Sequence, residues 1–355
     1  MRTPSEDAPP ARDENPAGRP AHRPTSRDVA QAAGVSQSTV SLVLNGKWSG
    51  RVSPATARSV QEAAQALGYR PNVAARNLRL GTTRTVLLVV PTLTSLFFGA
   101  VYIGAARVAA RHGFRIVVYP PDDAGFPGGT GAPADAPFGA RHEAIDGIIA
   151  SSMPLDAISG FGDVPVVMLD AGPDAGGAPT VDFDVGAGMR AITDHLAALG
   201  HRRVGHVAAA VDEWTFRARG AALAEAVQAL DGGRFAREAG AINVQAAKEA
   251  AGRLLDRPDR PTALVCDDDL IAAGAIKAAL ARGLEIPRDL SVTGFDDVQL
   301  ARAVEPELTT VRLPAGELGA RGLTALLEIL DGGRPGSRSL PVELVTRRST
   351  GPAPG

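Results

Sequence analysis

The sequence lacks features that several classes of protein require. A single cysteine, Cys266, among 355 residues excludes an internal disulfide framework and a zinc site built on cysteines. No run of 18 apolar residues is present, so we expect no membrane span. The chain has no P-loop, GxSxG elbow or HExxH motif. His195, His201 and His206 do not share one face at metal-ligand spacing. We therefore expect neither a metal site nor a cofactor.

The N-terminal segment, residues 1–24, is rich in proline and carries charges of both signs without an apolar core. This composition predicts a disordered tail rather than a signal peptide, which favours a cytoplasmic protein. The remaining length has room for a small domain followed by a large one of about 270 residues. Hydrophobic residues make up 45% of the chain, enough for a sizeable core.

Residues 25–80 show the pattern of three short helices followed by a fourth that is too short to be stable alone. Thr25 and Asp28 form a start for the first helix that resembles a capping box. Gly34 permits a tight turn after it, and Ser36 can cap the second helix. Capping and stop signals also bound the third helix, at Ser53, Pro54 and Gly68.

The second helix, which extends through about residue 44, has two distinct faces. Its apolar face is formed by Val40, Val43 and Leu44. Its other face is formed by Gln37, Ser38, Ser41 and Leu42. In a helix-turn-helix, the outward face near the start of the second helix meets base edges. Glutamine can pair with adenine, serine with several acceptors, and an apolar side chain with a thymine methyl group. An ordinary helical bundle would show similar capping signals.

Charge separates these two alternatives. Between Arg23 and Arg84, nine basic side chains accompany only two acidic ones, Asp28 and Glu62, so the net charge of this segment is +7. The whole chain carries −2, which leaves −9 for everything outside the segment. A basic module attached to an acidic body is the electrostatic pattern of a domain that binds the phosphates of a nucleic acid. The sequence therefore indicates that residues 25–71 form a helix-turn-helix DNA-binding domain rather than an ordinary helical bundle.

Two runs, DVAQAAGVSQSTVSLVLNG and VSPATARSVQEAAQALGYRPNVAARNL, resemble the lactose-repressor (LacI/GalR) family of bacterial transcription regulators. The resemblance covers the chain from about Thr25 to Thr350. It implies a homodimer whose headpieces read a pseudo-palindromic double-stranded DNA operator. It also implies a hinge helix that inserts a leucine into the minor groove, and a C-terminal domain that binds a small effector.

The candidate DNA-binding residues combine the outward helix face with positions taken from the family pattern. They are Thr25, Gln37, Ser38, Thr39, Ser41, Leu42, Asn45, Arg51, Asn72, Ala75 and Leu78. The resemblance implies that Leu78 is the minor-groove wedge of a hinge helix and linker over 72–83, although a plain interdomain linker is the alternative. Leu42 stands where the family frequently has arginine, so operator preference does not carry over. Trp48 can pack either on the sugar-phosphate backbone or on the headpiece.

From Arg84 onward, short apolar runs alternate with amphipathic helices, as in parallel α/β layers. Strands are predicted at 86–91, 114–120, 145–151, 164–170, 202–209, 262–268, 290–297 and 340–348. The fold predicted for 84–355 is α/β with two doubly wound parallel sheets, which resembles the two-lobed periplasmic-binding-protein fold of the family. The predicted N-lobe spans about 84–182 and 312–338, and the C-lobe about 183–311 and 339–355. Segment 120–144 is too rich in glycine and proline for a helix.

Ligands of open α/β sheets bind beyond the carboxyl ends of the strands. Those ends carry carboxylates and aromatic rings, and the family pattern adds a guanidinium, a combination that suits a sugar. Carried over by position, the candidate effector-binding residues are Phe97, Asp156, Arg217, Asp268 and Asp296. Each has a structural alternative, because strand-end carboxylates can be satisfied by backbone N–H groups and Phe97 can belong to the core.

The leading hypothesis is an effector-controlled transcription regulator that acts as a repressor, and two other functions compete with it. Gly186, Gly188 and Ala191 fit GxGxxA, and Asp212 follows the next strand, as a dinucleotide-dependent enzyme would require. The family's lobe-start helix explains the same residues, so we expect no enzyme. A solute-binding protein is opposed by the missing signal peptide and by the basic headpiece.

Overall fold

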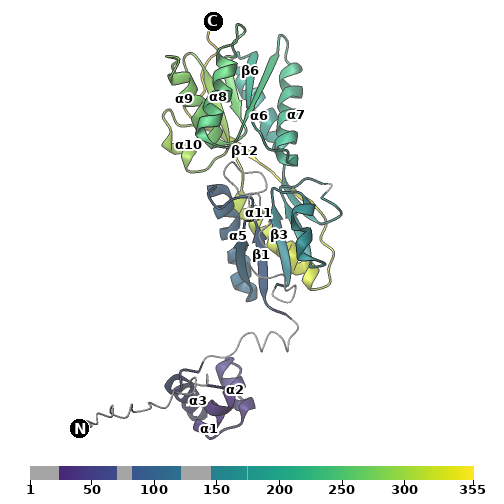
Figure 1. Ribbon diagram of the computed structural model, residues 1–355, viewed down its shortest axis with the longest axis vertical. Helices are drawn as coiled ribbons and strands as arrows, with labels where there is room; N and C mark the ends of the chain where they lie inside the picture. Colours follow the sequence, from purple (N-terminus) through teal and green to yellow (C-terminus); the bar gives the residue numbers. More distant parts are fainter. Residues whose placement is uncertain (1–23, 70–81, 121–144, 174) are drawn as a thin grey trace, which may run out of the picture. The chain divides into compact units, whose positions relative to one another are not determined.

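The computed structural model describes residues 24–69, 82–120, 145–173 and 175–355, which fall in two compact units, Met1–Gly81 and Thr82–Gly355 (Figure 1). The predicted tail lies outside the described residues, apart from its last residue. The predicted hinge contacts Asn72, Ala75 and Leu78 and nearly all of segment 120–144 also lie outside them. Across the described residues, no helix is both long enough and apolar enough to cross a membrane.

Within residues 24–69, the first unit has three helices: α1 (Ser26–Ala32), α2 (Gln37–Leu44) and α3 (Pro54–Ala66). Each begins at a capping residue that the sequence predicts. Thr25 and Asp28 form a reciprocal capping box, and the Ser36 and Ser53 hydroxyls accept backbone N–H bonds in the first turns of α2 and α3. Gly34 has φ +65°, a conformation that glycine adopts without strain and that makes the turn between α1 and α2.

A small apolar core holds the three helices of this unit together. Val29 of α1, Val40 and Val43 of α2, and Val60 of α3 are at most 2% exposed and belong to one cluster. Burying four valines in a unit of this size supplies several kcal/mol, since each contributes about 1.5–3 kcal/mol. Trp48 packs partly buried against this cluster, so within the structure it lies on the headpiece.

The second unit contains two six-stranded sheets. The first has the order β11-β5-β4-β3-β1-β2 and is parallel throughout. Its strands are β1 (Thr85–Val89), β2 (Arg115–Tyr119), β3 (Gly147–Ser151), β4 (Val166–Leu169), β5 (Thr180–Phe183) and β11 (Arg338–Leu340). Helices α5 (Leu96–His112) and α11 (Ala315–Leu330) pack together on one face, and the 3-10 helix η2 (Leu155–Phe161) covers the other. We call this layer set the N-lobe.

The second sheet has the order β12-β10-β9-β8-β6-β7, with only the β10–β12 pair antiparallel. Its strands are β6 (Arg203–Ala209), β7 (Arg234–Gly240), β8 (Ala263–Cys266), β9 (Ser291–Asp296), β10 (Thr309–Arg312) and β12 (Glu343–Val345). One face carries α6 (Val185–Ala198) and α7 (Trp214–Gln228). The other carries α8 (Val244–Leu255) and α9 (Asp269–Leu280), with α10 (Leu300–Ala303) beside α9. We call this layer set the C-lobe.

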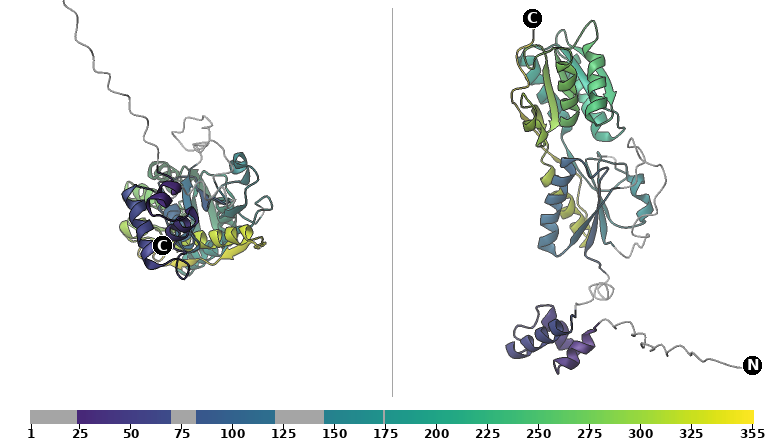
Figure 2. Two further views of the ribbon diagram at one scale, coloured as in Figure 1. Left: turned by 90° about the horizontal axis from the view of Figure 1, so that it is seen from below. Right: turned by 60° about the vertical axis from the view of Figure 1, so that its left-hand side comes forward.

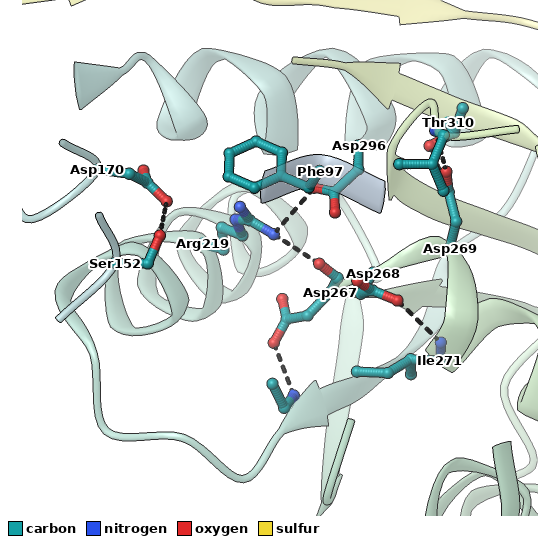
Figure 3. Close-up of polar contacts among 12 residues, drawn as sticks. Phe97, Ser152, Asp170, Arg219, Asp267, Asp268, Asp269, Ile271, Asp296 and Thr310 are labelled. Carbon is teal, nitrogen blue, oxygen red and sulfur yellow. Dashed lines mark hydrogen bonds and ion pairs between the residues drawn. The ribbon is translucent and has the colours of Figure 1, made fainter. Parts of the chain in front are cut away.

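The chain passes between the two lobes three times, after Phe183, Arg312 and Leu340 (Figure 2). One apolar cluster runs from the α5 and α11 face of the N-lobe to the α6 and α7 face of the C-lobe. The structure therefore confirms the predicted fold class of a helical headpiece followed by two doubly wound sheets. It also places the carboxyl ends of β4, β8 and β9, together with the start of α7, around one region between the lobes (Figure 3).

One predicted strand has the wrong bounds, and four strands were not predicted, β11 among them. The predicted strand 340–348 contains β12 and only the last residue of β11, which lies in the other sheet, because the chain crosses between lobes after Leu340, where Pro341 has no N–H to continue a ladder. Strands β5, β7 and β10 were missed as well. The first and last have only four residues each, and β7 is a half-exposed edge strand of mixed polarity.

Candidate functional site

Helix α2 presents a polar face to solvent because its apolar side chains are anchored in the headpiece core. Val40 and Val43 are buried, whereas Gln37, Ser38 and Ser41 are exposed. Successive residues of an α-helix are rotated by about 100°, so the buried side chains lie on one face and the exposed ones on another. The buried face anchors the helix, and the exposed face points outward. The structure therefore confirms the two faces read from the sequence, although Leu42 on the outer side is half-buried.

Short local hydrogen bonds orient the polar side chains of this face. The Ser36 hydroxyl lies 2.7 Å from that of Ser38 and 2.9 Å from that of Thr39. At the other end of α2, Asn45 Nδ2 donates to the Ser41 carbonyl and hydroxyl oxygens. These bonds keep donors and acceptors at the helix surface, where a nucleic-acid partner can exchange with them. Thr25 caps α1, and Arg51 is exposed in the loop before α3.

The second candidate site is a buried group of charged side chains between the lobes, drawn in Figure 3. We call Asp170, Arg219, Asp268 and Asp296 the interlobe cluster. Asp170 follows β4 of the N-lobe, and Arg219 lies on α7 of the C-lobe. Figure 3 places Arg219 centrally, with Asp170 on one side and Asp268 and Asp296 on the other. Three carboxyl groups therefore surround a single guanidinium.

Arg219 is held by contacts with the C-lobe. Its Nη1 donates to the Asp267 carbonyl oxygen at 2.6 Å and lies 3.9 Å from an Asp296 carboxylate oxygen. The guanidinium also lies 4.1 Å from the centroid of the Phe295 ring, a cation–π contact. The side chain is only 4% exposed, yet its Nε finds no hydrogen-bond partner within the described ranges of the chain. A buried donor without a partner is costly, so a ligand that accepts a hydrogen bond here would be favoured.

Asp170 approaches the cluster from the N-lobe. Its Oδ2 accepts a hydrogen bond from Ser152 at 3.3 Å, while its buried Oδ1 has no hydrogen-bond partner among the residues that the structure describes, although the Thr215 side chain acts to lower the pKa of Asp170. Burial raises the pKa of Asp170 to about 6, although the charge of Arg219 acts in the opposite direction. The backbone at Asp170 is in the left-handed region with φ +51°. Backbone strain of this kind persists only where the surrounding structure imposes it, and it is concentrated at functional sites.

The other two carboxyl groups of the cluster belong to the C-lobe. Burial raises the pKa of Asp296 well above its usual range, and the nearby charge of Asp268 adds to the effect. Burial also raises the pKa of Asp268, against the backbone N–H groups of Leu270 and Ile271 that stabilise its charge. Asp296 has φ +111°, a further strained position. Strained, buried carboxyl groups with raised pKa values are typical of functional sites.

The three consecutive aspartates after β8 point in different directions, as expected from one strand end. Asp267 accepts hydrogen bonds from His206 and from the backbone of Ala209. Asp268 caps α9. Asp269 accepts from the hydroxyl of Thr310 and the backbone N–H of Val298, and burial raises its pKa to about 7. Only Asp268 among them joins the interlobe cluster.

The structure brings together two of the five predicted effector residues and places the others around them. Asp268 and Asp296 lie in the interlobe cluster. Phe97 is 7% exposed and makes edge contacts with Phe98 and Phe183, so it belongs to the apolar core bordering the cluster. Asp156 is exposed on η2. Arg217 is 60% exposed and forms an ion pair with Asp212 at 2.7 Å. An effector role for each of the five stays a prediction.

Sequence reasoning missed Arg219 and Asp170, although signals for both were present. The buried residues of α7 are Thr215, Arg219, Leu223 and Val227, which follow a four-residue helical spacing. That spacing assigns Arg219, and not Arg217, to the inner face. Asp170 ends the predicted strand 164–170, so the strand-end rule that selected Asp296 applied to it as well.

Gly188 of the GxGxxA match has a packing role. A Cβ on Gly188 would come within 3.0–3.2 Å of Phe295, Val311 and Val342, so the glycine lets α6 lie close to the second sheet. Asp212, which would hold a ribose in the enzyme hypothesis, is paired with Arg217. These contacts give the dinucleotide hypothesis no support.

Comparison with known proteins agrees with this arrangement. Residues 25–72 match the model of bacterial regulatory proteins of the lacI family, and residues 193–350 match that of the periplasmic binding protein-like domain. The HTH-type transcriptional repressor CytR of Escherichia coli (strain K12) is 33% identical over 346 residues, covering 92% of this chain and 96% of that protein.

Solved structures show the same likeness. The lac repressor dimer bound to operator and the anti-inducer ONPF matches with a TM-score of 0.81 at 26% identity, covering 93% of this chain and 100% of that one. The complex of the transcriptional regulator CelR with cellobiose matches with a TM-score of 0.66 at 28% identity, covering 92% and 100%. With a helix-turn-helix unit, two doubly wound lobes and relatives that match along nearly the whole length, the chain belongs to the lacI family of bacterial regulatory proteins.

Proposed function

We propose that this protein is a dimeric, sequence-specific DNA-binding repressor of transcription, controlled by an uncharged sugar bound at the interlobe cluster. It acts in the cytoplasm and is not an enzyme. The observation that carries this proposal is the pairing of an exposed polar helix face on a basic headpiece with unpartnered buried polar atoms between two lobes. One surface suits a DNA groove, and the other suits a small polar ligand.

In this proposal the outer face of α2 reads base edges. Gln37, Ser38 and Ser41 supply donors and acceptors, and Leu42 supplies an apolar contact to a thymine methyl group. The remaining headpiece contacts go to the same groove or to phosphates: Thr25, Thr39, Asn45 and Arg51. The proposed hinge, residues 72–83, contributes Asn72, Ala75 and Leu78, with Leu78 as the minor-groove wedge. In this proposal the headpiece spans residues 25–71, and the effector domain begins at residue 84.

The charges of the interlobe cluster favour an uncharged ligand over an acidic one. Asp170, Asp268 and Asp296 accompany one guanidinium, and burial already disfavours their charged forms. A phosphorylated sugar would add negative charge to this enclosed region, where repulsion is poorly screened. Sugar hydroxyls, by contrast, can donate to Asp170 Oδ1 and accept from Arg219 Nε. Asp156 and Arg217 would contact the ligand from the rim, and Phe97 would support it from behind.

Dimerisation is supported by apolar side chains exposed on the helices of both lobes. On α5, Leu96 is 59% and Ile103 is 51% exposed, and on α9 Leu280 is 58% exposed. Large apolar side chains left in water at helix surfaces favour an interface. The lac repressor, which this chain resembles, forms a dimer on its operator. A second copy of this chain is therefore the proposed partner for these helices.

The DNA part of the proposal is tested by selection from random duplexes. The selected sequence should be pseudo-palindromic and should bind about 1000-fold or more tightly than an unselected duplex of equal length in a fluorescence anisotropy titration. Enrichment of no sequence would contradict the proposal. Enrichment of an asymmetric single site would contradict its dimeric form.

The effector part is tested with matched pairs of sugars. Glucose and ribose are compared with glucose 6-phosphate and ribose 5-phosphate, and cellobiose is added as a disaccharide. We expect at least one uncharged sugar to raise the thermal unfolding midpoint and to change operator affinity, and its phosphate to do neither. The variant Asp296→Ala should lose the response. A response to a phosphate alone would contradict the charge argument.

A further inference from the structure

A second contact joins the lobes beside the interlobe cluster, between Trp214 and Gly172. Gly172 belongs to the turn after β4 in the N-lobe, and Trp214 is the first residue of α7 in the C-lobe. A Cβ on Gly172 would lie 2.5–2.6 Å from three atoms of the Trp214 indole ring. Such a separation is well inside van der Waals contact, so the ring lies directly against the glycine backbone.

The N-lobe side of this contact is held rigidly. The backbone N–H groups of Ala171 and Gly172 both donate to Asp182 Oδ1, at 3.0 and 2.9 Å. Asp182 Oδ2 in turn accepts from the hydroxyl of Thr180 at 2.7 Å. Asp182 is itself buried. The turn therefore presents a fixed flat surface, and a side chain added at Gly172 could not withdraw from the indole.

The same turn and the same helix also carry two charged groups of the interlobe cluster. Asp170 precedes Gly172 by two residues, and Arg219 follows Trp214 by five. The charge of Arg219 acts on Asp170 across the lobe boundary. The turn that contacts Trp214 thus also carries Asp170, and the charge of Arg219 on the same helix acts to lower the pKa of that carboxyl group. Movement of α7 away from the turn would break the Trp214 contact and weaken this electrostatic interaction.

We propose that Trp214, seated on Gly172, is a positioning residue that locks the two lobes together beside the interlobe cluster. This inference rests on the proposed function, because it assigns the lock to the regulation of the effector site. A ligand between Asp170 and Arg219 contacts both halves of the lock. A ligand that binds one of the two conformations, locked or unlocked, more tightly than the other would shift the equilibrium between them. Control by an effector requires this difference in affinity.

Two glycines of one loop provide a matched test. Gly172 and Gly177 both have left-handed backbone, with φ +88° and +82°, but beyond its chain neighbours nothing in the described part of the chain lies within 4 Å of a Cβ built on Gly177. Alanine at either position introduces the same backbone strain. Only Gly172→Ala places a methyl group against Trp214. The difference between the two variants therefore isolates the interlobe contact.

The readout is the fluorescence of Trp214 in the full chain. The chain has two tryptophans, so Trp48→Phe leaves Trp214 as the sole emitter. In this background, Gly172→Ala should shift the emission maximum to longer wavelength and expose the ring to acrylamide, whereas Gly177→Ala should change neither. Equal behaviour of the two variants, or an unshifted spectrum in Gly172→Ala, would overturn the lock.

A double-mutant cycle keeps the test decisive if Gly172→Ala weakens folding. Gly172→Ala should lower the thermal midpoint more than Gly177→Ala when Trp214 is present, and by the same amount as Gly177→Ala when Trp214→Ala removes the ring. Additive effects of Gly172→Ala and Trp214→Ala would refute the contact. Operator binding of the same samples is measured separately. A chain that selects no DNA but shows the non-additive cycle refutes the proposed function and leaves the lobe contact standing.

Discussion

The outer face of α2 and the interlobe cluster are both polar, yet they are built in opposite ways. Gln37, Ser38 and Ser41 are exposed and uncharged, so folding removes little of their hydration. Asp170, Asp296 and Arg219 are enclosed, and burial shifts the pKa values of both carboxyl groups upward. The outer face of α2 therefore contributes little to the free energy of unfolding, whereas the buried charges of the interlobe cluster lower it.

This difference indicates how each surface can recognise its partner. An exposed face of hydroxyl and amide groups suits a large, hydrated and charged partner such as DNA, whose phosphates position the protein and whose base edges give specificity. An enclosed cluster with unpartnered atoms suits a small molecule that completes its hydrogen bonds. Functional sites commonly keep such locally unfavourable features, so substitutions there can raise stability while lowering function.

The largest expected effect separates the two units themselves. Val60 is fully buried at the centre of the headpiece core, so Val60→Asp would enclose an unpaired carboxylate and destabilise this unit by about 4 kcal/mol or more. Operator binding should be lost, while the thermal transition of the effector domain should be unchanged in calorimetry. Gln61→Asp, at an exposed neighbour on α3, is the control and should leave the headpiece folded. A lowered midpoint of the effector domain in Val60→Asp would show that the units do not fold separately.

The next effect compares the two arginines of α7. Arg219→Ala removes the guanidinium from among three buried carboxyl groups and should destabilise the effector domain by about 3–5 kcal/mol at pH 8. Because carboxyl groups can take up protons, the loss should be smaller at pH 5. Arg217 is 60% exposed, so Arg217→Ala should change the unfolding free energy by no more than about 0.5 kcal/mol. Denaturant unfolding of both variants at the two pH values decides the matter, and similar losses would invalidate the assignment of Arg219 to the cluster.

Asp170→Asn should increase the free energy of unfolding, whereas Arg219→Ala should decrease it. The pKa of Asp170 is raised from 3.8 to about 6 in the folded protein. The folded state therefore binds more protons than the unfolded state between these values, and stability falls as pH rises through the window. The ionised group costs on the order of 3 kcal/mol above pH 6. Asparagine removes that cost, so the variant should be more stable than wild type at pH 8 and about equal at pH 4. It should also respond more weakly to the effector, and a variant equally stable at pH 8 would contradict the buried, charged Asp170.

The sequence could predict the headpiece in detail because its determinants are local. Thr25, Ser36 and Ser53 act within one turn of their own helices, and the positions of Val40 and Val43 follow from the helical period. Two lobes of alternating strands and helices were also predictable from hydrophobic runs. The family pattern supplied Asp268 and Asp296, both of which the structure places in the interlobe cluster.

Contacts between distant segments could not be predicted in this way. Asp170 accepts a hydrogen bond from Ser152 of its own lobe and is influenced by the charge of Arg219 in the other, and no local pattern specifies that the turn at Gly172 meets Trp214. Arg217 and Arg219 are two residues apart, and only the burial of one face of α7 distinguishes them. The bounds of the predicted strand 340–348 were wrong because the crossing after Leu340 depends on both sheets. Burial and pKa shifts arise from these tertiary arrangements.

The smallest effect separates stability from recognition within a single helix. Ser36 caps α2 through the backbone N–H of Thr39, so Ser36→Ala should lower headpiece stability by about 1 kcal/mol. Gln37 is the next residue and is exposed, so Gln37→Ala should leave stability within about 0.5 kcal/mol of wild type. If Gln37 pairs with a base edge, the same substitution weakens binding to the selected operator by about 1–3 kcal/mol and leaves binding to random duplex unchanged. Circular-dichroism melting and anisotropy titrations measure the two quantities independently. Undiminished operator affinity in Gln37→Ala would show that Gln37 does not contact a base edge. An exposed glutamine that contributes nothing to stability can affect function only through contact with its partner.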